Sequence, residues 1–183
     1  MVIVMKVLCI FLFIIIILGL IGIYYAHIYN IISTYKLKID KAENSIDDAL
    51  RNKYDNIMKA NIIIKKIIPK KDYLKEFTDL KEKNISNYEL DRKLTEAENL
   101  ILELKNDYSK LNEKDFNKIL KEIYNLNETL VAGKNYYNKN TAELNKYIRK
   151  FPSNIVAKIH HYKIKPFFDG KNMQDEIVDD FKL

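Results

Sequence analysis

The sequence predicts an all-α protein in which an N-terminal transmembrane helix continues into an elongated antiparallel helical bundle. Residues 7–26 form an apolar run without a charged residue, and apolar residues recur beyond it at steps of three and four. Only four Gly and three Pro occur among the 183 residues. Such a low content of turn-forming residues favours a few long helices over many short strands.

The apolar run is the first element and follows a short flank, residues 1–6. Some 20 residues at about 1.5 Å each span roughly 30 Å, the hydrocarbon thickness of a bilayer. No cleavage pattern of small residues follows the run, and Cys9 stands too early for a lipid-modified cysteine. We therefore interpret residues 7–26 as an uncleaved, single-pass anchor in the cell membrane.

The lysines that flank the anchor give a weak indication of its orientation. Lys6 precedes the anchor, whereas Lys36, Lys38 and Lys41 follow it. Because positive residues are enriched on the cytoplasmic side, the count leans slightly towards a cytoplasmic soluble domain. Long domains cross membranes regardless of flank charge, so the side of the membrane stays open.

The next helix is predicted to continue directly from the anchor, since no Gly or Pro occurs between residues 27 and 68. We expect it to extend about 60 Å before Pro69 stops it. Its apolar seam shifts by one residue at Leu50, which suggests a local change of supercoil. The seam consists of Ile28, Ile32, Tyr35, Ile39, Ala42, Ile46 and Ala49, followed by Leu50, Tyr54, Ile57 and Ile64.

The second helix is expected to begin after Asp72, a suitable N-cap residue. Its apolar face runs from Tyr73 to Leu80, weakens across residues 84–87 and resumes at Leu94. We predict a kink or a short loop at residues 84–87. The bundle then has three long helices, or four if the second is broken there.

The third long helix is predicted from the N-cap candidate Asp115 to Pro152. Gly133 lies on its apolar seam, which indicates either a close helix–helix approach or a tolerated weak spot. A short helical piece is expected from Asn154 to about His161.

The soluble helical domain therefore covers residues 27–168, and an acidic tail, residues 169–183, is expected to fray. We expect the Pro166-Phe167-Phe168 segment to pack back on the domain or to lie near the membrane.

The charges and the reactive side chains indicate a binding protein more than an enzyme. The net charge is +6, but 25 acidic residues are interleaved with 31 basic ones, as on solvated helix faces and unlike a nucleic-acid-binding surface. His160 and His161 point about 100° apart on a helix and lack a third ligand at the required spacing. We predict no metal, no cofactor, no nucleic-acid partner and no enzymatic activity, because no recognisable catalytic arrangement occurs.

Two segments of the chain resemble conserved blocks of the LemA family of membrane-anchored helical proteins. The first block begins directly after the anchor, and the second surrounds a Phe-Pro-Ser-Asn sequence. The matching residues include Tyr29, Asn30, Asp47, Tyr54 and Asp55 in the first block and Tyr137, Asn138, Asn145, Phe151, Pro152 and Asn154 in the second. The chain departs from the family pattern at Glu43, where a tryptophan is usual, and at Met58-Lys59, where Pro-Asn is usual.

The resemblance implies a bacterial-type membrane protein with a helical bundle and no agreed biochemical activity. We expect the polar motif residues to hydrogen-bond between the first and third helices, with Ser153 or Asn154 as an N-cap, and rank a binding site second. The predicted function is a membrane-anchored interaction or scaffolding protein, whose partners are the lipid bilayer through residues 7–26 and another protein. An alternative is a sensor that binds a ligand or peptide between the helices near Gly133. Oligomerisation is compatible with either function.

Overall fold

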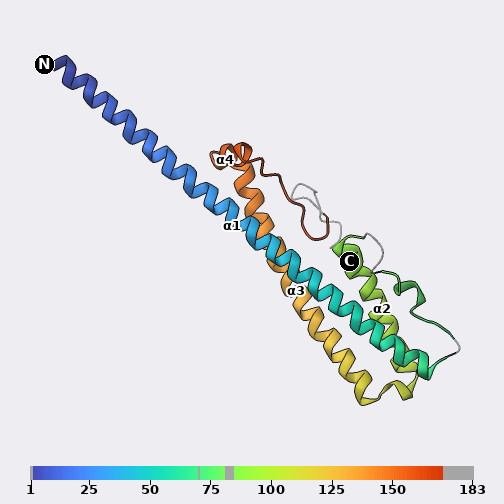
Figure 1. Ribbon diagram of the computed structural model, residues 1–183. Helices are drawn as coiled ribbons and strands as arrows, with labels where there is room; N and C mark the ends of the chain where they lie inside the picture. The colour runs from blue at the N-terminus through green and yellow to red at the C-terminus, as the bar shows by residue number, and fades with distance from the viewer. Residues whose placement is uncertain (1, 70, 81–84, 171–183) are drawn as a thin grey trace, which may run out of the picture. The chain divides into compact units, whose positions relative to one another are not determined.

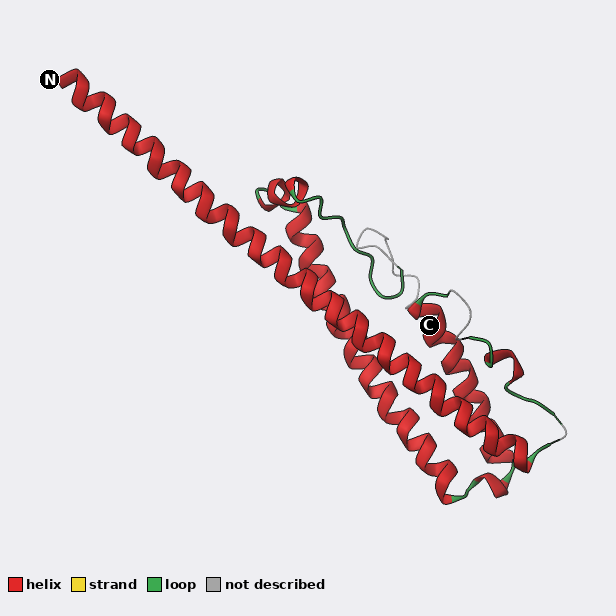
Figure 2. Cartoon of the chain, viewed as in Figure 1, coloured by secondary structure: helices red, strands yellow, loops and turns green. Residues whose placement is uncertain are grey.

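The structure is a computed structural model that describes residues 2–69, 71–80 and 85–170. These residues form α-helices and 3-10 turns, with no strand among them (Figures 1 and 2). The all-α prediction is therefore confirmed. The helices are α1 (Val2–Ile67), α2 (Asn87–Asp107), α3 (Lys114–Arg149) and α4 (Ser153–Ile159), and the 3-10 turns are η1 (Lys75–Phe77) and η2 (Ser109–Leu111).

Helix α1 is 66 residues long; it contains the predicted anchor and continues beyond it. It is the one helix of the described chain that is long and apolar enough to cross a membrane, by length and composition. Its most apolar window has a mean hydropathy of 3.2, and none of that window is buried within the protein. The predicted continuation into the soluble part is confirmed, and the helix ends at Ile67, just before Pro69.

The chain divides into two compact units, which we describe separately. Among the described residues, the first unit comprises 2–38 and 140–165, and the second comprises 39–139 and 166–170. The predicted boundaries of the soluble domain at residues 27 and 168 stay a prediction, and most of the predicted acidic tail lies outside the described residues.

In the second unit, α2 runs in the same direction as α1, and α3 runs antiparallel to both. This follows from the order of the contacts: Gly133 of α3 approaches Ile46 of α1, and Asn127, further back along α3, bonds to Lys53, further along α1. Lys53 also pairs with Glu98 of α2. The chain between α1 and α2 therefore returns along the unit before α2 begins.

This returning segment corrects the prediction of a helix that begins after Asp72. Among residues 71–80 the structure contains only the 3-10 turn Lys75–Phe77. Asp72 instead forms an ion pair with Lys65 at 2.8 Å. The apolar spacing was misleading because Leu74, Phe77 and Leu80 are all buried, although the backbone that carries them is not α-helical.

Helix α2 begins where a break was expected, and α3 begins at Lys114, two residues before the first helical position that an Asp115 N-cap would give. Ser86 is the N-cap of α2, and its side chain accepts a hydrogen bond from the Glu89 N–H at 3.2 Å. Asp115 lies in the first turn of α3 instead of capping it, a position where a carboxylate still favours the helix dipole. Residues 81–84 lie outside the described part of the chain.

In the first unit, Ser153 is the first residue of α4 and its side chain does not cap that helix, which corrects the N-cap prediction. Its hydroxyl lies 2.7 Å from the carbonyl oxygens of Tyr147 and Lys150, at the C-terminal end of α3, where carbonyl groups run out of partners within the helix. Pro152 occupies the N-cap position of α4 and makes no side-chain cap hydrogen bond. Asn154 lies inside α4, and its buried Oδ1 has no hydrogen-bond partner.

Candidate functional site

A groove of about 280 Å³ lies in the second unit and is open to solvent. Parts of α1, α2 and α3 and the segment after Lys165 form its walls. The lining residues that matter most are Ile46, Asn87, Tyr88, Tyr137, Phe167 and Phe168. The groove therefore combines one aliphatic and four aromatic side chains with polar groups, near the glycine that the sequence singled out.

Gly133 lets α1 and α3 approach each other beside this groove. A Cβ atom at position 133 would lie 3.1 Å from Cγ1 of Ile46, which is tighter than an ordinary contact. Of the two interpretations of this glycine, the structure thus supports close helix approach. Tyr137 follows one helical turn later, on the same face of α3, and so faces the groove.

Phe168 is held in place by two of the family-motif residues. The Asn138 side-chain oxygen accepts a hydrogen bond from the Phe168 N–H at 2.9 Å. The Tyr137 hydroxyl donates to the Pro166 carbonyl at 3.2 Å. The rings of Tyr88 and Tyr137 meet the Phe168 ring edge-on, with centroids 6.1 Å and 6.4 Å away. These contacts fix an aromatic wall, because edge-to-face pairs have a preferred geometry.

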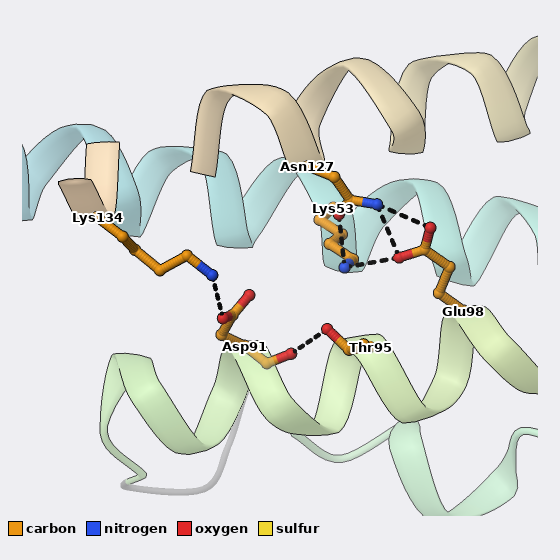
Figure 3. A network of polar contacts seen from close by, with 6 residues as sticks. All are labelled: Lys53, Asp91, Thr95, Glu98, Asn127 and Lys134. Carbon is orange, nitrogen blue, oxygen red and sulfur yellow. Dashed lines mark hydrogen bonds and ion pairs between the residues drawn. The ribbon is translucent and has the colours of Figure 1, made fainter. Parts of the chain in front are cut away.

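A positive charge lies beside the same wall. The Lys134 ammonium is 2.8 Å from the Asp91 carboxylate and 5.7 Å from the centroid of the Phe168 ring. Both charged side chains are partly buried, so solvent screens their attraction less than on an open surface. The pair joins α2 to α3 (Figure 3).

Further along the unit, Lys53, Glu98 and Asn127 form a polar network that joins three helices (Figure 3). Lys53 is 1% exposed, and its ammonium lies 2.8 Å from both the Glu98 carboxylate and the Asn127 side-chain oxygen. The Asn127 amide donates to both Glu98 oxygens, at 2.8 Å and 3.0 Å. A buried charge is tolerated only when it is paired and hydrogen-bonded in this way. We assign this network to stability.

In the first unit, the Asn145 side chain forms hydrogen bonds with both the N–H and the carbonyl oxygen of Lys165. Its amide donates to the Lys165 carbonyl at 2.7 Å, and its oxygen accepts from the Lys165 N–H at 2.9 Å. The expected bonding of Asn138 and Asn145 to the first helix is therefore corrected: both asparagines bind the chain that follows α4. An extended segment has unpaired backbone groups, which a side-chain amide can satisfy.

The other motif residues lie apart from the groove. The Tyr29 ring centroid lies 4.5 Å from that of the His160 ring, and Asn30 lines another hollow of about 280 Å³, both in the first unit. In the second unit, Tyr54 donates a hydrogen bond to the Thr78 carbonyl and so secures the returning segment. Asp47 pairs with Arg51 on the same helix at 2.8 Å.

Asp55, a further motif residue of the second unit, is exposed on α1. Phe151 and Pro152 are exposed at the turn before α4, in the first unit.

From the sequence, no role was assigned to Lys53, which matches the family pattern beside Tyr54, and Tyr88 was not singled out. Lys53 was detectable, because it falls on the core face of α1 with Leu50 and Ile57 at steps of three and four. A lysine at such a position indicates a buried ion pair. Tyr88 gave no signal, because it lies at the start of a helix whose partners are remote in sequence.

Two titratable groups outside the groove have shifted pKa values. A hydrogen bond with Tyr73, helped by the negative charge of Asp107, raises the pKa of Tyr108 above its usual value. A hydrogen bond from Lys93 lowers the pKa of the exposed Glu96 carboxyl. Within the described residues, no three His, Cys, Asp or Glu side chains are grouped to hold a metal ion.

The described residues combine an all-helical fold, one candidate membrane span and an aromatic groove, which places the protein in the class of helical-bundle proteins. The sequence profile of the LemA family matches residues 42–179, more than half of the chain, and the chain belongs to the LemA family. Tyr29 and Asn30 precede the matched range, whereas the other nine motif residues lie inside it. No curated protein and no solved structure matches the chain.

Proposed function

We propose that this LemA family protein is a membrane-anchored, non-catalytic interaction protein that binds a segment of another protein in the groove of its second unit. Residues 7–26 anchor it as a single-pass helix. The aromatic groove is the observation that carries the proposal.

The composition of the groove supports binding of a peptide segment. Aromatic side chains such as Tyr88 and Phe168 provide large contact areas with little loss of conformational entropy and are enriched at protein interfaces. Tyr88 is 46% exposed and therefore available to a partner, whereas Tyr137 is buried and supports the Phe168 ring. A bulky apolar side chain of the partner would replace solvent beside these rings.

The lining of the groove supports binding in preference to catalysis. It contains no histidine or cysteine among the described residues, and the hydroxyl of Ser86 already caps α2. A nucleophile needs a neighbouring base within hydrogen-bond distance. The groove is also lined by the carboxylates of Glu43 and Asp169, but among the described residues the contact seen for the Ser86 hydroxyl is the one with the Glu89 N–H. The absence of catalytic activity remains part of the proposal.

A small-ligand sensor is the second candidate, because it would use the same groove. Small-molecule pockets usually enclose about 300–1,000 Å³ and bury most of their ligand. A groove of about 280 Å³ that is open to solvent suits one or two side chains of a peptide better. Native mass spectrometry of the purified full chain would detect a small ligand as an added mass that the Tyr88→Ala variant lacks.

The interaction is tested by comparing Tyr88→Ala with Tyr124→Ala in the full-length protein. Tyr124 lies on α3 outside the groove and is 61% exposed, so it is a matched control for the loss of a surface tyrosine. After mild-detergent extraction and affinity purification, quantitative mass spectrometry should show at least about a tenfold loss of the partner with Tyr88→Ala only. Equal recovery with both variants would contradict a groove-bound partner.

A further inference from the structure

Helix α4 and the turn before it carry apolar side chains on two faces. Val156 and Ala157 are buried, as expected for a packed helix. Phe151, Ile155 and Ile159 are nevertheless 73%, 50% and 56% exposed. Ile155 and Ile159 are spaced by four residues and so share one face of the helix. A stripe of large exposed apolar side chains marks a protein or membrane contact.

This apolar stripe adjoins the end of the candidate membrane span. Phe151 and Ile155 line a hollow of about 530 Å³ together with Leu20, Ile21 and Tyr24 of α1. Leu20, Ile21 and Tyr24 belong to the last turns of residues 7–26. The stripe is therefore continuous with the exposed apolar surface that α1 would present to lipid.

Polar contacts hold α4 against α1 at this level. The Tyr25 hydroxyl lies 2.6 Å from Nε2 of His160, and the Ser33 hydroxyl lies 2.9 Å from the Tyr162 hydroxyl. These contacts attach the C-terminal end of α4 to the helix that carries the anchor. The position of α4 along α1 is thus fixed, and insertion of the anchor would bring α4 to the bilayer surface.

Positive charge is concentrated in the segment that carries the apolar stripe. Residues 143–165 contain six basic residues and one acidic residue, a net charge of +5 out of +6 for the whole chain. Lys146 and Lys150 are spaced by four residues and line a second hollow of about 410 Å³ with Tyr24 and Phe151. Lys146 also forms an exposed ion pair with the Glu143 carboxylate at 3.5 Å. Two lysines that share a hollow with aromatic and aliphatic groups match the chemistry of a phospholipid, which joins a phosphate to acyl chains.

We propose that the turn before α4 and the exposed face of α4 lie in the membrane interface and bind an anionic phospholipid. Lys146 and Lys150 bind its headgroup, and an acyl chain lies in the hollow between Leu20 and Ile155. This inference rests on the proposed anchoring by residues 7–26. It goes beyond the anchor because it assigns a lipid site to residues more than 100 positions later in the chain.

Tryptophan substitution tests the depth of the turn, since the chain has no tryptophan of its own. Three single-tryptophan variants of the full chain, Phe13→Trp in the anchor, Phe151→Trp in the turn and Tyr124→Trp on α3, are placed in vesicles of phosphatidylcholine and phosphatidylglycerol. Brominated acyl chains quench tryptophan that lies in or beside the hydrocarbon. The proposal expects strong quenching with Phe13→Trp and Phe151→Trp and none with Tyr124→Trp.

The quenching results distinguish a failure of the interfacial lipid site from a failure of the anchor. Quenching with Phe13→Trp but not with Phe151→Trp would overturn the interfacial site while leaving the anchor intact. No quenching with Phe13→Trp would overturn the anchoring and this inference with it.

The headgroup contact is tested in the Phe151→Trp background by the Lys146→Gln/Lys150→Gln pair. Quenching by brominated phosphatidylglycerol should exceed quenching by brominated phosphatidylcholine, and the preference should fall about fivefold for each lysine removed. Lys118→Gln/Lys121→Gln, an exposed pair elsewhere on α3, is the control for total charge. An unchanged preference in the first pair, or an equal loss in the control, would overturn the assignment of the headgroup to Lys146 and Lys150.

Discussion

At the scale of single residues, Lys53 lies between Leu50 and Ile57 on the buried face of α1. Its charge is compensated by Glu98 and Asn127, which come from two other helices. Removing one member of a buried pair leaves the other charge without a partner, whereas removing both members does not. We therefore predict that substituting both Lys53 and Glu98 destabilises the protein less than substituting Glu98 alone.

Glu98→Leu should lower the free energy of unfolding by about 3 kcal/mol, because it leaves the Lys53 ammonium buried without its carboxylate. Lys53→Met together with Glu98→Leu should return stability to within about 1 kcal/mol of the unsubstituted protein. Urea titration of the full chain in detergent, followed by circular dichroism, measures both values. A double variant no more stable than Glu98→Leu would contradict the assignment.

Gly133 gives a second prediction at this scale, because two effects oppose each other there. Ala is favoured over Gly in a helix by about 1 kcal/mol, but its Cβ would lie 3.1 Å from Ile46. Gly133→Ala alone should therefore give no gain in stability. In an Ile46→Ala background the same substitution should stabilise the protein by about 1 kcal/mol. Equal effects in both backgrounds, by the same urea titration, would show that the two residues are not coupled.

At the scale of elements, the sequence correctly predicted the helices in which apolar residues recur at steps of three and four on an α-helical backbone. The part of α1 beyond the anchor was predictable as one continuous helix because no Gly or Pro occurs between residues 27 and 68. The segment around Leu74 and Phe77 was not, because its apolar residues fill the core from an irregular backbone. Periodicity reports which residues are buried, and it does not distinguish a helix from a connection that packs equally well.

Two asparagines hold the backbone of the segment after α4 by hydrogen bonds. Amide exchange in this segment therefore reports on whether those hydrogen bonds form. Asn145 binds Lys165, and Asn138 binds Phe168. Asn145→Ala should raise amide hydrogen exchange at Lys165 by about tenfold, because a typical hydrogen bond contributes about 1 kcal/mol or somewhat more. Asn138→Ala should do the same at Phe168.

Amide exchange of the full chain, followed by mass spectrometry with residue resolution, distinguishes these two effects. Asp47→Ala serves as the control, since Asp47 bonds only Arg51 on the same exposed helix face in the contacts seen. Exchange that rises equally with Asp47→Ala would indicate general destabilisation. Unchanged exchange with Asn138→Ala and Asn145→Ala would contradict the structural role given to these motif residues.

At the scale of the whole molecule, the sequence predicted the candidate span and the family but not the groove. Gly133 and the tyrosines drew attention to the correct region of α3. The groove itself needs Tyr88 from the start of α2 and Phe168 from the segment after α4, and their meeting depends on the parallel course of α1 and α2. Spacing along one helix carries no information about such contacts.

The central claim, that the groove binds a segment of another protein, is tested most directly by photo-cross-linking in intact cells. A photoreactive phenylalanine replaces Tyr88 in the groove or Tyr124 outside it, in the full-length protein. The account predicts a discrete cross-linked species from position 88 that is lost when Phe168 is changed to Ala and is absent from position 124. The same cross-linked species from both positions, or none from position 88 at normal expression, would contradict it.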